Sequence, residues 1–571
     1  QPNAGITSAI VGSSASGIVV IGDQFVTING DNVGGDVARN LTVNNTATTA
    51  NSYVVGLFNF GGTKVARNAT VRYSNIRGGV TVAGTVSWGI ILNGSGGDYD
   101  NVLIENNKIW QAYVGIGHYG VAATGINNNN IIRNNIIGDT TGSNESIKLR
   151  GIEVTQSSGL TIDGNDVFGL PAGNSNSTQA GILLSTGGAN NTVTRNNIHD
   201  FYYIGTGGLS THGILISENG GTTNITNNFI HNIKADGDVF NTATNILWMP
   251  AGITISGTTT GTLNIDHNSI YMSGATLGST FTGNSACFSS VAGVTGVNFR
   301  NNALRNSMTT VGAPDPDNKT YAIATIGAGS LGTMFSAIDN NTYFVNGSNP
   351  NIGTFGQTDR VNLAAFQAAT TQDASSLDVD PQFISTSDLH LNVVGHLLIG
   401  GGTTLPGLTV DYDNDPRPAS NPDIGADEIV QAEGGVIPAG TFYNVSFNIG
   451  NTLAGNLTVN NRLYLFTVMN PGSSSITLGC NAVAVNASSV SYINGAVTKN
   501  YCGAENFTFP VGDGGFYSPA NVNVTAVGVV PSSLTVTPYD ATLGGFDPST
   551  SLSRNWNLEE TGDLTADLLF Y

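Results

Sequence analysis

Three aspartates at alternate positions form the sharpest candidate metal site in the sequence: Asp411, Asp413 and Asp415. Carboxylates spaced in this way near a turn are typical of a Ca²⁺-binding loop. Pro416 and Pro422 occupy the positions at which an EF-hand needs Gly and Glu, so an EF-hand is excluded. Two interpretations remain: a structural Ca²⁺ site to which Asp423 or Asp427 contributes, or a hydrogen-bonded cap in which Arg417 pairs with one carboxylate.

The weak catalytic candidates are two basic residues, Lys148 and Arg150, which alternation places on one face of a strand. A polysaccharide lyase needs acidic residues to hold a cation and a base to accept a proton. Glu145 and Glu153 are nearby in the sequence. A solvated ion pair explains the same residues without any reaction, and no paired carboxylates stand out as a glycosidase site.

Two histidines, His199 and His231, occupy the same position of an internal repeat, so we expect their rings to stack. Asp200 and Asn232 follow them directly. A zinc site needs more ligands than this to be convincing. We therefore interpret the pair as a stack of polar rings.

The chain has three cysteines. Cys480 and Cys502 can form a disulfide in an oxidising compartment. Cys287 is expected to be a buried apolar residue. So few cysteines are typical of a large fold that needs no cross-links.

A short motif recurs along the chain and must position these residues. It consists of an apolar residue, two free positions, Asn, one free position and another apolar residue, as in 104–109. Its copies begin about 30 to 40 residues apart, which is typical of a solenoid. We expect the motif asparagines to lie at corners, where Asn tolerates a left-handed backbone, and to form an internal ladder. They are Asn107, Asn135, Asn165, Asn196, Asn228, Asn268, Asn302 and Asn341.

The repeats contain short apolar strands and no helical periodicity, which predicts coils of a parallel β-helix stacked about 4.8 Å apart. We expect this β-helix over residues 1–397. Thr358 and Asp359 are the expected cap of a helix near 358–370 that covers the end of the solenoid. An Asp- and Pro-rich closing segment is expected over 398–435, followed by a smaller β-sandwich domain over 436–571. The chain ends within an apparent strand, so we expect a segment of a longer protein.

The composition limits the partners. The formal net charge is −20, with only 19 Lys and Arg, which argues against nucleic acid and against an anionic membrane surface. It also makes an acidic polysaccharide a poor partner unless metal ions bridge the two. No run of 18 apolar residues occurs, so no membrane-spanning helix is expected.

Several stretches resemble a family of large right-handed parallel β-helix proteins that bacteria with type IX secretion export to their surface. The stretches are 363–369, 380–383, 389–391, 403–408, 411–417, 422–428, 554–558 and 561–564. The resemblance covers nearly the whole chain and implies a right-handed β-helix and an extracellular or outer-surface location. It implies no particular activity. The residues of this chain do not include the sorting domain that usually ends such proteins, so we expect a longer precursor.

Two functions follow as hypotheses. The first is a non-enzymatic surface or matrix protein that is adhesive or assembles with copies of itself into an oligomer or fibre through its strand edges. The second is a β-helix that binds extracellular polysaccharide or cleaves it as a lyase does. Fold alone does not decide between them.

Overall fold

The computed structural model describes residues 8–570 except 33–37, 61–64, 81–84, 94–98, 122–125, 140–144, 170–177, 204–209, 218–219, 236–248, 258–260, 277–282, 310–317, 326–330, 357, 393–395, 432–434, 543, 546, 548 and 550–552. The chain forms two compact units. The β-helix unit comprises Gln1–Asn392, Gly400–Thr403 and Ile424–Asp427. The C-terminal unit comprises Val393–Ile399, Thr404–Asp423 and Glu428–Tyr571.

The segment expected to close the solenoid, 398–435, is thus divided between the two units. Short pieces of it belong to the β-helix because they hydrogen-bond to its corners. The Gly425 amide donates to the Asn301 carbonyl at 2.8 Å, and the Asn340 side chain donates to the Gly401 carbonyl at 3.0 Å.

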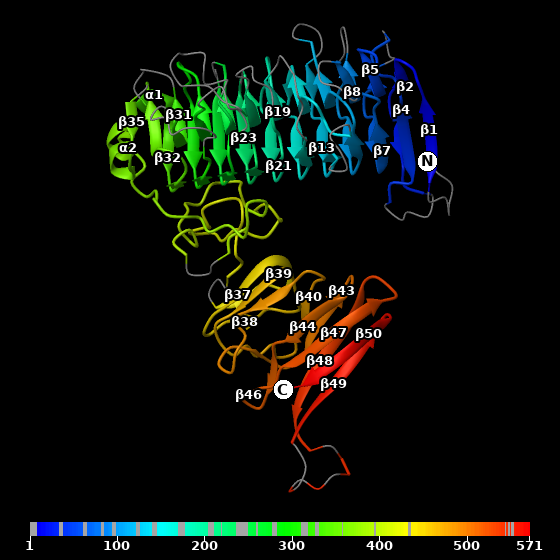
Figure 1. The fold of residues 1–571 in the computed structure, drawn as a ribbon, viewed down its shortest axis with the longest axis vertical. Coiled ribbons are helices and arrows are strands. Elements are labelled where there is room, and N and C mark those ends of the chain that lie inside the picture. Colours follow the sequence, from blue (N-terminus) through cyan, green and yellow to red (C-terminus); the bar gives the residue numbers. More distant parts are fainter. Residues whose placement is uncertain are drawn as a thin grey trace. The chain divides into compact units, whose positions relative to one another are not determined.

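Three long parallel sheets run along the β-helix unit, and successive coils add one strand to each (Figure 1). Sheet A has 11 strands, sheet B has 12 and sheet C has 10. One coil consists of β9 (Leu103–Glu105) in sheet C, β10 (Lys108–Trp110) in sheet A and β11 (Val114–Tyr119) in sheet B. The next coil pairs β13 (Ile131–Arg133), β14 (Ile136–Ile137) and β15 (Arg150–Thr155) with them in parallel.

The core of this unit follows from alternation along each strand. The first apolar residue of each motif points inward and pairs in register with its equivalent in the next coil, as Ile104 does with Ile132 and Ile132 with Ile162. All three are almost completely buried. Burying one such side chain stabilises the fold by about 1.5–3 kcal/mol, so the repeated motif produces one continuous core.

The left-handed corner residue is not the ladder asparagine, and that expectation was wrong. The positive φ angles fall on the residue before it, for example Asn106 (57°), Asn134 (53°) and Asn227 (54°). The ladder asparagine must instead keep its side chain inside the coil, so the turn is made one residue earlier.

The C-terminal end of the β-helix is closed by α2 (Leu363–Thr370), which begins later than expected. Asn362 is its N-cap and accepts a hydrogen bond from the Ala365 amide at 2.9 Å. Thr358 and Asp359 do not cap the helix, because they belong to β35 (Thr358–Arg360), which pairs antiparallel with β34 (Pro350–Phe355). This pairing satisfies backbone groups at the edge of sheet B.

The C-terminal unit is all-β and has one hydrophobic core. Its largest sheet starts with parallel strands β37 (Gly440–Phe447), β39 (Leu457–Leu465), β40 (Ile476–Leu478) and β43 (Val497–Tyr501). Antiparallel strands β48 (Ser532–Asp540) and β49 (Arg554–Thr561) complete it. A second, antiparallel sheet contains β44 (Glu505–Phe509), β47 (Ala520–Val527) and β50 (Leu564–Phe570). The parallel half was not predicted from the sequence.

Candidate functional site

The motif asparagines form a hydrogen-bonded column inside the β-helix. The Nδ2 group of each donates to Oδ1 of the next, from Asn107 to Asn341, at 2.9–3.1 Å. Each Nδ2 group also donates to a backbone carbonyl of the preceding coil, such as that of Ile162 for Asn196. All eight side chains are buried, so no ligand can reach them and their role is structural.

Each of the two basic candidates lies near enough to a glutamate for its charge to act on the pKa, Glu145 on Lys148 and Glu153 on Arg150. Lys148 Nζ donates to Ser146 Oγ at 2.9 Å, and an Arg150 guanidinium nitrogen donates to the Leu149 carbonyl at 3.2 Å. Glu145 instead pairs with Arg77 at 2.9 Å. Burial lowers the pKa of both basic groups. Neither residue lines the cleft described below.

The three alternating aspartates belong to the C-terminal unit, where Asp411 organises a turn. Its Oδ1 atom accepts hydrogen bonds from the amides of Asp413 (2.9 Å) and Asp415 (2.7 Å). Its Oδ2 atom accepts one from the Glu428 amide at 2.8 Å. Arg417 pairs with the carboxylate of Glu428 at 3.0 Å. These bonds favour a hydrogen-bonded cap, while the Ca²⁺ site stays a prediction.

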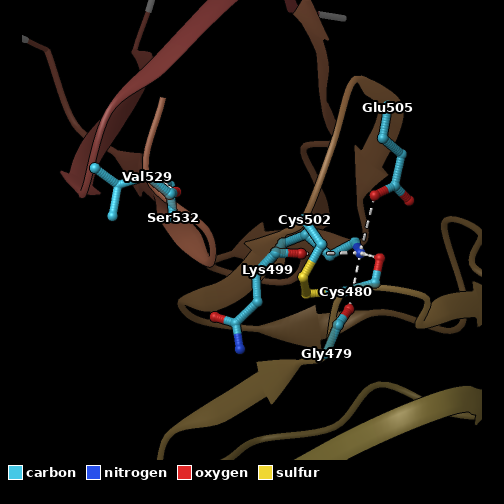
Figure 2. Close-up of a disulfide and its surroundings, with 8 residues drawn as sticks. Gly479, Cys480, Lys499, Cys502, Glu505, Val529 and Ser532 are labelled. Carbon is cyan, nitrogen blue, oxygen red and sulfur yellow. Dashed lines mark hydrogen bonds and ion pairs between the residues drawn. A yellow bond between two sulfur atoms is a disulfide. The ribbon is translucent and has the colours of Figure 1, made fainter. Parts of the chain in front are cut away.

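Cys480 and Cys502 are joined by a disulfide in the C-terminal unit, with their Cα atoms 5.5 Å apart (Figure 2). The buried ammonium group of Lys499 lies beside it and donates to the carbonyls of Gly479 (2.8 Å) and Cys480 (2.7 Å). Its charge is paired with Glu505 at 3.2 Å. Lys499 thus ties the ends of two strands that the disulfide also joins.

A cleft of about 590 Å³ lies on the outer face of sheet A. Strands β21 (Asn197–His199), β24 (Phe229–His231) and β27 (Ser269–Met272) contribute to its lining. Thr386 and Ser387, from the chain after α2, form part of its wall. The lining consists largely of amides, hydroxyls and imidazoles: Asn197, His199, Asp200, His231, Asn232, Lys234, Tyr271, Ser273, Gly274, Ser307, Thr386 and Ser387.

His199 lies between two carboxylates at this cleft. Its Nε2 atom is 3.0 Å from Asp166 and its Nδ1 atom 2.8 Å from Asp200. Burial opposes the charged form, but the hydrogen bonds and charges of the two aspartates raise the pKa of His199 to about 9. The imidazole is therefore a cation at neutral pH, and both of its N–H groups are occupied.

The carboxylate oxygens of Asp200 are likewise occupied by hydrogen-bond partners within the chain. Besides His199, Asp200 accepts hydrogen bonds from Tyr202 at 2.7 Å and from Asn232. Burial acts to raise the pKa of Asp200, but these donors and the imidazolium hold it well below its usual range. The carboxylate is thus fixed in its charged form and oriented by three side chains.

The two histidines stack as their register predicts, with ring centroids 4.9 Å apart and an interplanar angle of 7°. Burial and then the charge of His199 lower the pKa of His231 to about 3. The neutral ring contacts Asn197 Oδ1 through Nε2 at 3.2 Å. A cationic and a neutral imidazole thus lie face to face, an arrangement that two imidazolium ions would not tolerate.

The histidines belong to a longer column of planar side chains on consecutive strands of sheet A: Phe168, His199, His231, Tyr271, Arg305 and Phe344. Of this column, only the two histidines were predicted from the sequence. Tyr202 and Lys234, which lie on neighbouring coils and pair through an isolated bridge, were also missed. The signal for all of them was register: each member of the column lies three residues after a motif asparagine, and Tyr202 and Lys234 each lie six residues after one.

Among the comparisons with known proteins, the family model bears on the fold of the first part of the chain. Residues 61–270 match the family model of the right-handed beta helix region. No curated protein matches the chain. A solved structure described as the complex of XylC with xylose matches with 12% identity and a TM-score of 0.27. That match covers 68% of this chain and 66% of the other, just under two thirds of its length.

No helix among the described residues is long and apolar enough to cross a membrane. The family match and the three parallel sheets together identify the N-terminal part of this chain as a right-handed parallel β-helix.

Proposed function

We propose that this protein is a secreted, non-enzymatic adhesive protein of the outer surface or matrix, and that it binds extracellular polysaccharide in the cleft on sheet A. The cleft itself carries the proposal. It presents hydroxyl and amide groups from successive coils, and such groups are suited to the hydroxyls of a sugar chain. Coils about 4.8 Å apart repeat at a spacing comparable to one sugar unit, so a linear polymer can run along the sheet.

The hydrogen-bond network supports binding rather than cleavage. Both N–H groups of His199 and both oxygens of Asp200 are occupied by partners within the chain. A general base must be within reach of the proton that it removes, and neither group is free to play that part. Cleavage of a polysaccharide remains the alternative function, and release of shorter or unsaturated products would establish it.

Filling the cleft tests the proposal. Ser387 is exposed on the cleft wall, so Ser387→Trp should obstruct a sugar chain without disturbing the core. We expect the variant to lose at least about tenfold in affinity for immobilised polysaccharides that the unmodified protein retains. Ser473→Trp, at an exposed turn of the C-terminal unit, is the matched control. Equal binding by all three proteins, or no binding by the unmodified protein, would refute the proposal.

Self-association is a second candidate function, favoured by the first coil. Ile10 is 71% exposed and Phe25 75% exposed, and β1 (Ala9–Ser13) is an edge strand of sheet A. Because α2 covers the other end of the β-helix, pairing between first coils would give a dimer and not a fibre. Sedimentation across a wide concentration range tests this: Ile10→Lys should shift the chain toward monomer. Monomers of the unmodified protein at every concentration would exclude self-association.

A further inference from the structure

Lys234 stands out among the residues that line the cleft on sheet A. It follows β24 and pairs through an isolated bridge with Tyr202 of the preceding coil. Its ammonium nitrogen lies 5.2 Å from the centroid of the Tyr202 ring. The side chain is half-buried and faces the cleft beside Ser273 and Gly274.

The hydrogen-bonding capacity of the other charged lining groups is used within the chain. His199 donates to two aspartates, and Asp200 accepts from His199, Tyr202 and Asn232. Lys234 differs, because no carboxylate oxygen of the described residues lies within 4 Å of its nitrogen and its attraction to Asp200 acts only at longer range. Its three N–H donors are therefore available to a ligand.

A partly desolvated ammonium group is best matched by an anionic acceptor, since charge-assisted hydrogen bonds are about twice as strong as neutral ones. The overall charge of −20 opposes an acidic polymer at long range. That repulsion is largely screened beyond about 8 Å at physiological ionic strength. A direct contact at Lys234 is screened much less, so the local group can decide the selectivity.

We propose that Lys234 recognises the acidic group of the bound polysaccharide, either the carboxylate of a uronic acid or a sulfate ester. The neighbouring hydroxyl of Ser273 and the amide of Asn232 then contact the sugar hydroxyls. This inference rests on the proposed binding of polysaccharide at the cleft. It reverses, for this one site, the exclusion of acidic polymers that the overall charge suggests.

The test uses two matched pairs of polymers and the full chain. Polygalacturonate is compared with its fully methyl-esterified form, and dextran sulfate with dextran, by isothermal titration calorimetry. We expect at least one acidic polymer to bind about tenfold or more tightly than its neutral partner. The pair that shows the preference distinguishes a carboxylate from a sulfate ligand.

Variants then assign the preference to the residue. Lys234→Met keeps the length of the side chain and should abolish the preference, whereas Lys234→Arg should retain most of it. Lys108→Met removes a lysine from the same sheet but outside the cleft, where it pairs with Asp139 at 2.7 Å, and should change nothing. Equal binding of acidic and neutral polymers, unaffected by Lys234→Met, would overturn the inference and leave the proposed function intact. Failure of all four polymers to bind would count against both.

Discussion

At the scale of single residues, the chain uses buried polar side chains in two ways. The ladder asparagines satisfy one another along the axis of the β-helix, so their burial costs little. The groups around His199 instead form a cluster in which one imidazolium is shared by Asp166 and Asp200. The first arrangement is repeated in successive coils from Asn107 to Asn341 and stabilises the solenoid. The second occurs at one place and shapes the cleft.

Removing one ladder asparagine should leave several buried partners unsatisfied. Asn196 donates to Asn228, Ile162 and Thr194 and accepts from Asn165. We expect Asn196→Ala to lower the free energy of unfolding by about 3 kcal/mol, measured by guanidinium denaturation. Asn264→Ala is the control, because Asn264 belongs to a partly exposed ladder on sheet C; its cost should stay below about 1 kcal/mol. Similar losses for both variants would contradict a special role of burial.

The pKa of His199 predicts how stability depends on pH. Its value of about 9 in the folded chain lies above the value of about 6.5 expected in the unfolded chain. The cluster therefore contributes fully to stability below about pH 6.5, and this contribution is lost as the pH rises through about 9. We expect the difference in melting temperature between the unmodified protein and His199→Gln to shrink over that range. A difference that is independent of pH would show that His199 does not titrate there.

At the scale of elements, segments outside the repeated coils cover the end of the β-helix core and bind backbone amides in turns. The α2 helix buries Phe366 against Tyr343 and Phe355 at one end of the β-helix. The turn around Asp411 holds amides of three residues with a single carboxylate. In α2 an apolar ring covers the end of the core, and in the turn a carboxylate accepts hydrogen bonds from backbone amides.

Experiments on the Asp411 turn can distinguish a hydrogen-bonded cap from a structural Ca²⁺ site. Both oxygens of Asp411 face N–H donors, so an amide in either orientation would place its own N–H group against one of them. We expect Asp411→Asn to cost about 2 kcal/mol, and we expect EDTA to leave the melting temperature of the unmodified protein unchanged. A melting temperature that falls in EDTA and recovers with Ca²⁺ would instead establish the structural Ca²⁺ site.

At the scale of the whole molecule, the chain consists of two units whose strands are arranged differently. The β-helix unit repeats one coil and needs only nearest neighbours. The C-terminal unit combines parallel and antiparallel strands around its own core. Cross-links and caps are therefore local: the disulfide lies within the C-terminal unit, and α2 within the β-helix unit.

The position of the disulfide predicts two separable responses to reduction. It closes a loop between residues 22 positions apart, and a loop of this size contributes about 3 kcal/mol. We expect Cys480→Ser to destabilise the C-terminal unit by about this amount and to leave the β-helix unit unchanged, as followed by hydrogen exchange of each unit. Cys287→Ser, inside the β-helix core, should have the reverse effect. Loss of protection in the β-helix after Cys480→Ser would show that the units do not unfold separately.

The sequence by itself determined the architecture. A motif with Asn at a constant place, such as 104–109, dictates a coil, because one inward apolar residue and one amide per coil can be satisfied only by identical neighbours. The pairing of the two cysteines and the stacking of His199 and His231 could also be predicted from the sequence. The start of α2 could not, because Thr358 and Asn362 are equally good caps and only the pairing of β35 with β34 decides between them.

Only the tertiary structure decided where the cleft on sheet A lies. Asp166, Tyr202 and Lys234 are separated along the sequence by whole coils, and none has a motif of its own. Register brings their strands together, and the chain after α2 then adds Thr386 and Ser387 to the wall of the cleft. The charge that such a cleft presents depends on which of its charged side chains already pair with a neighbour. These pairs form only in the folded chain, so the sequence does not reveal them.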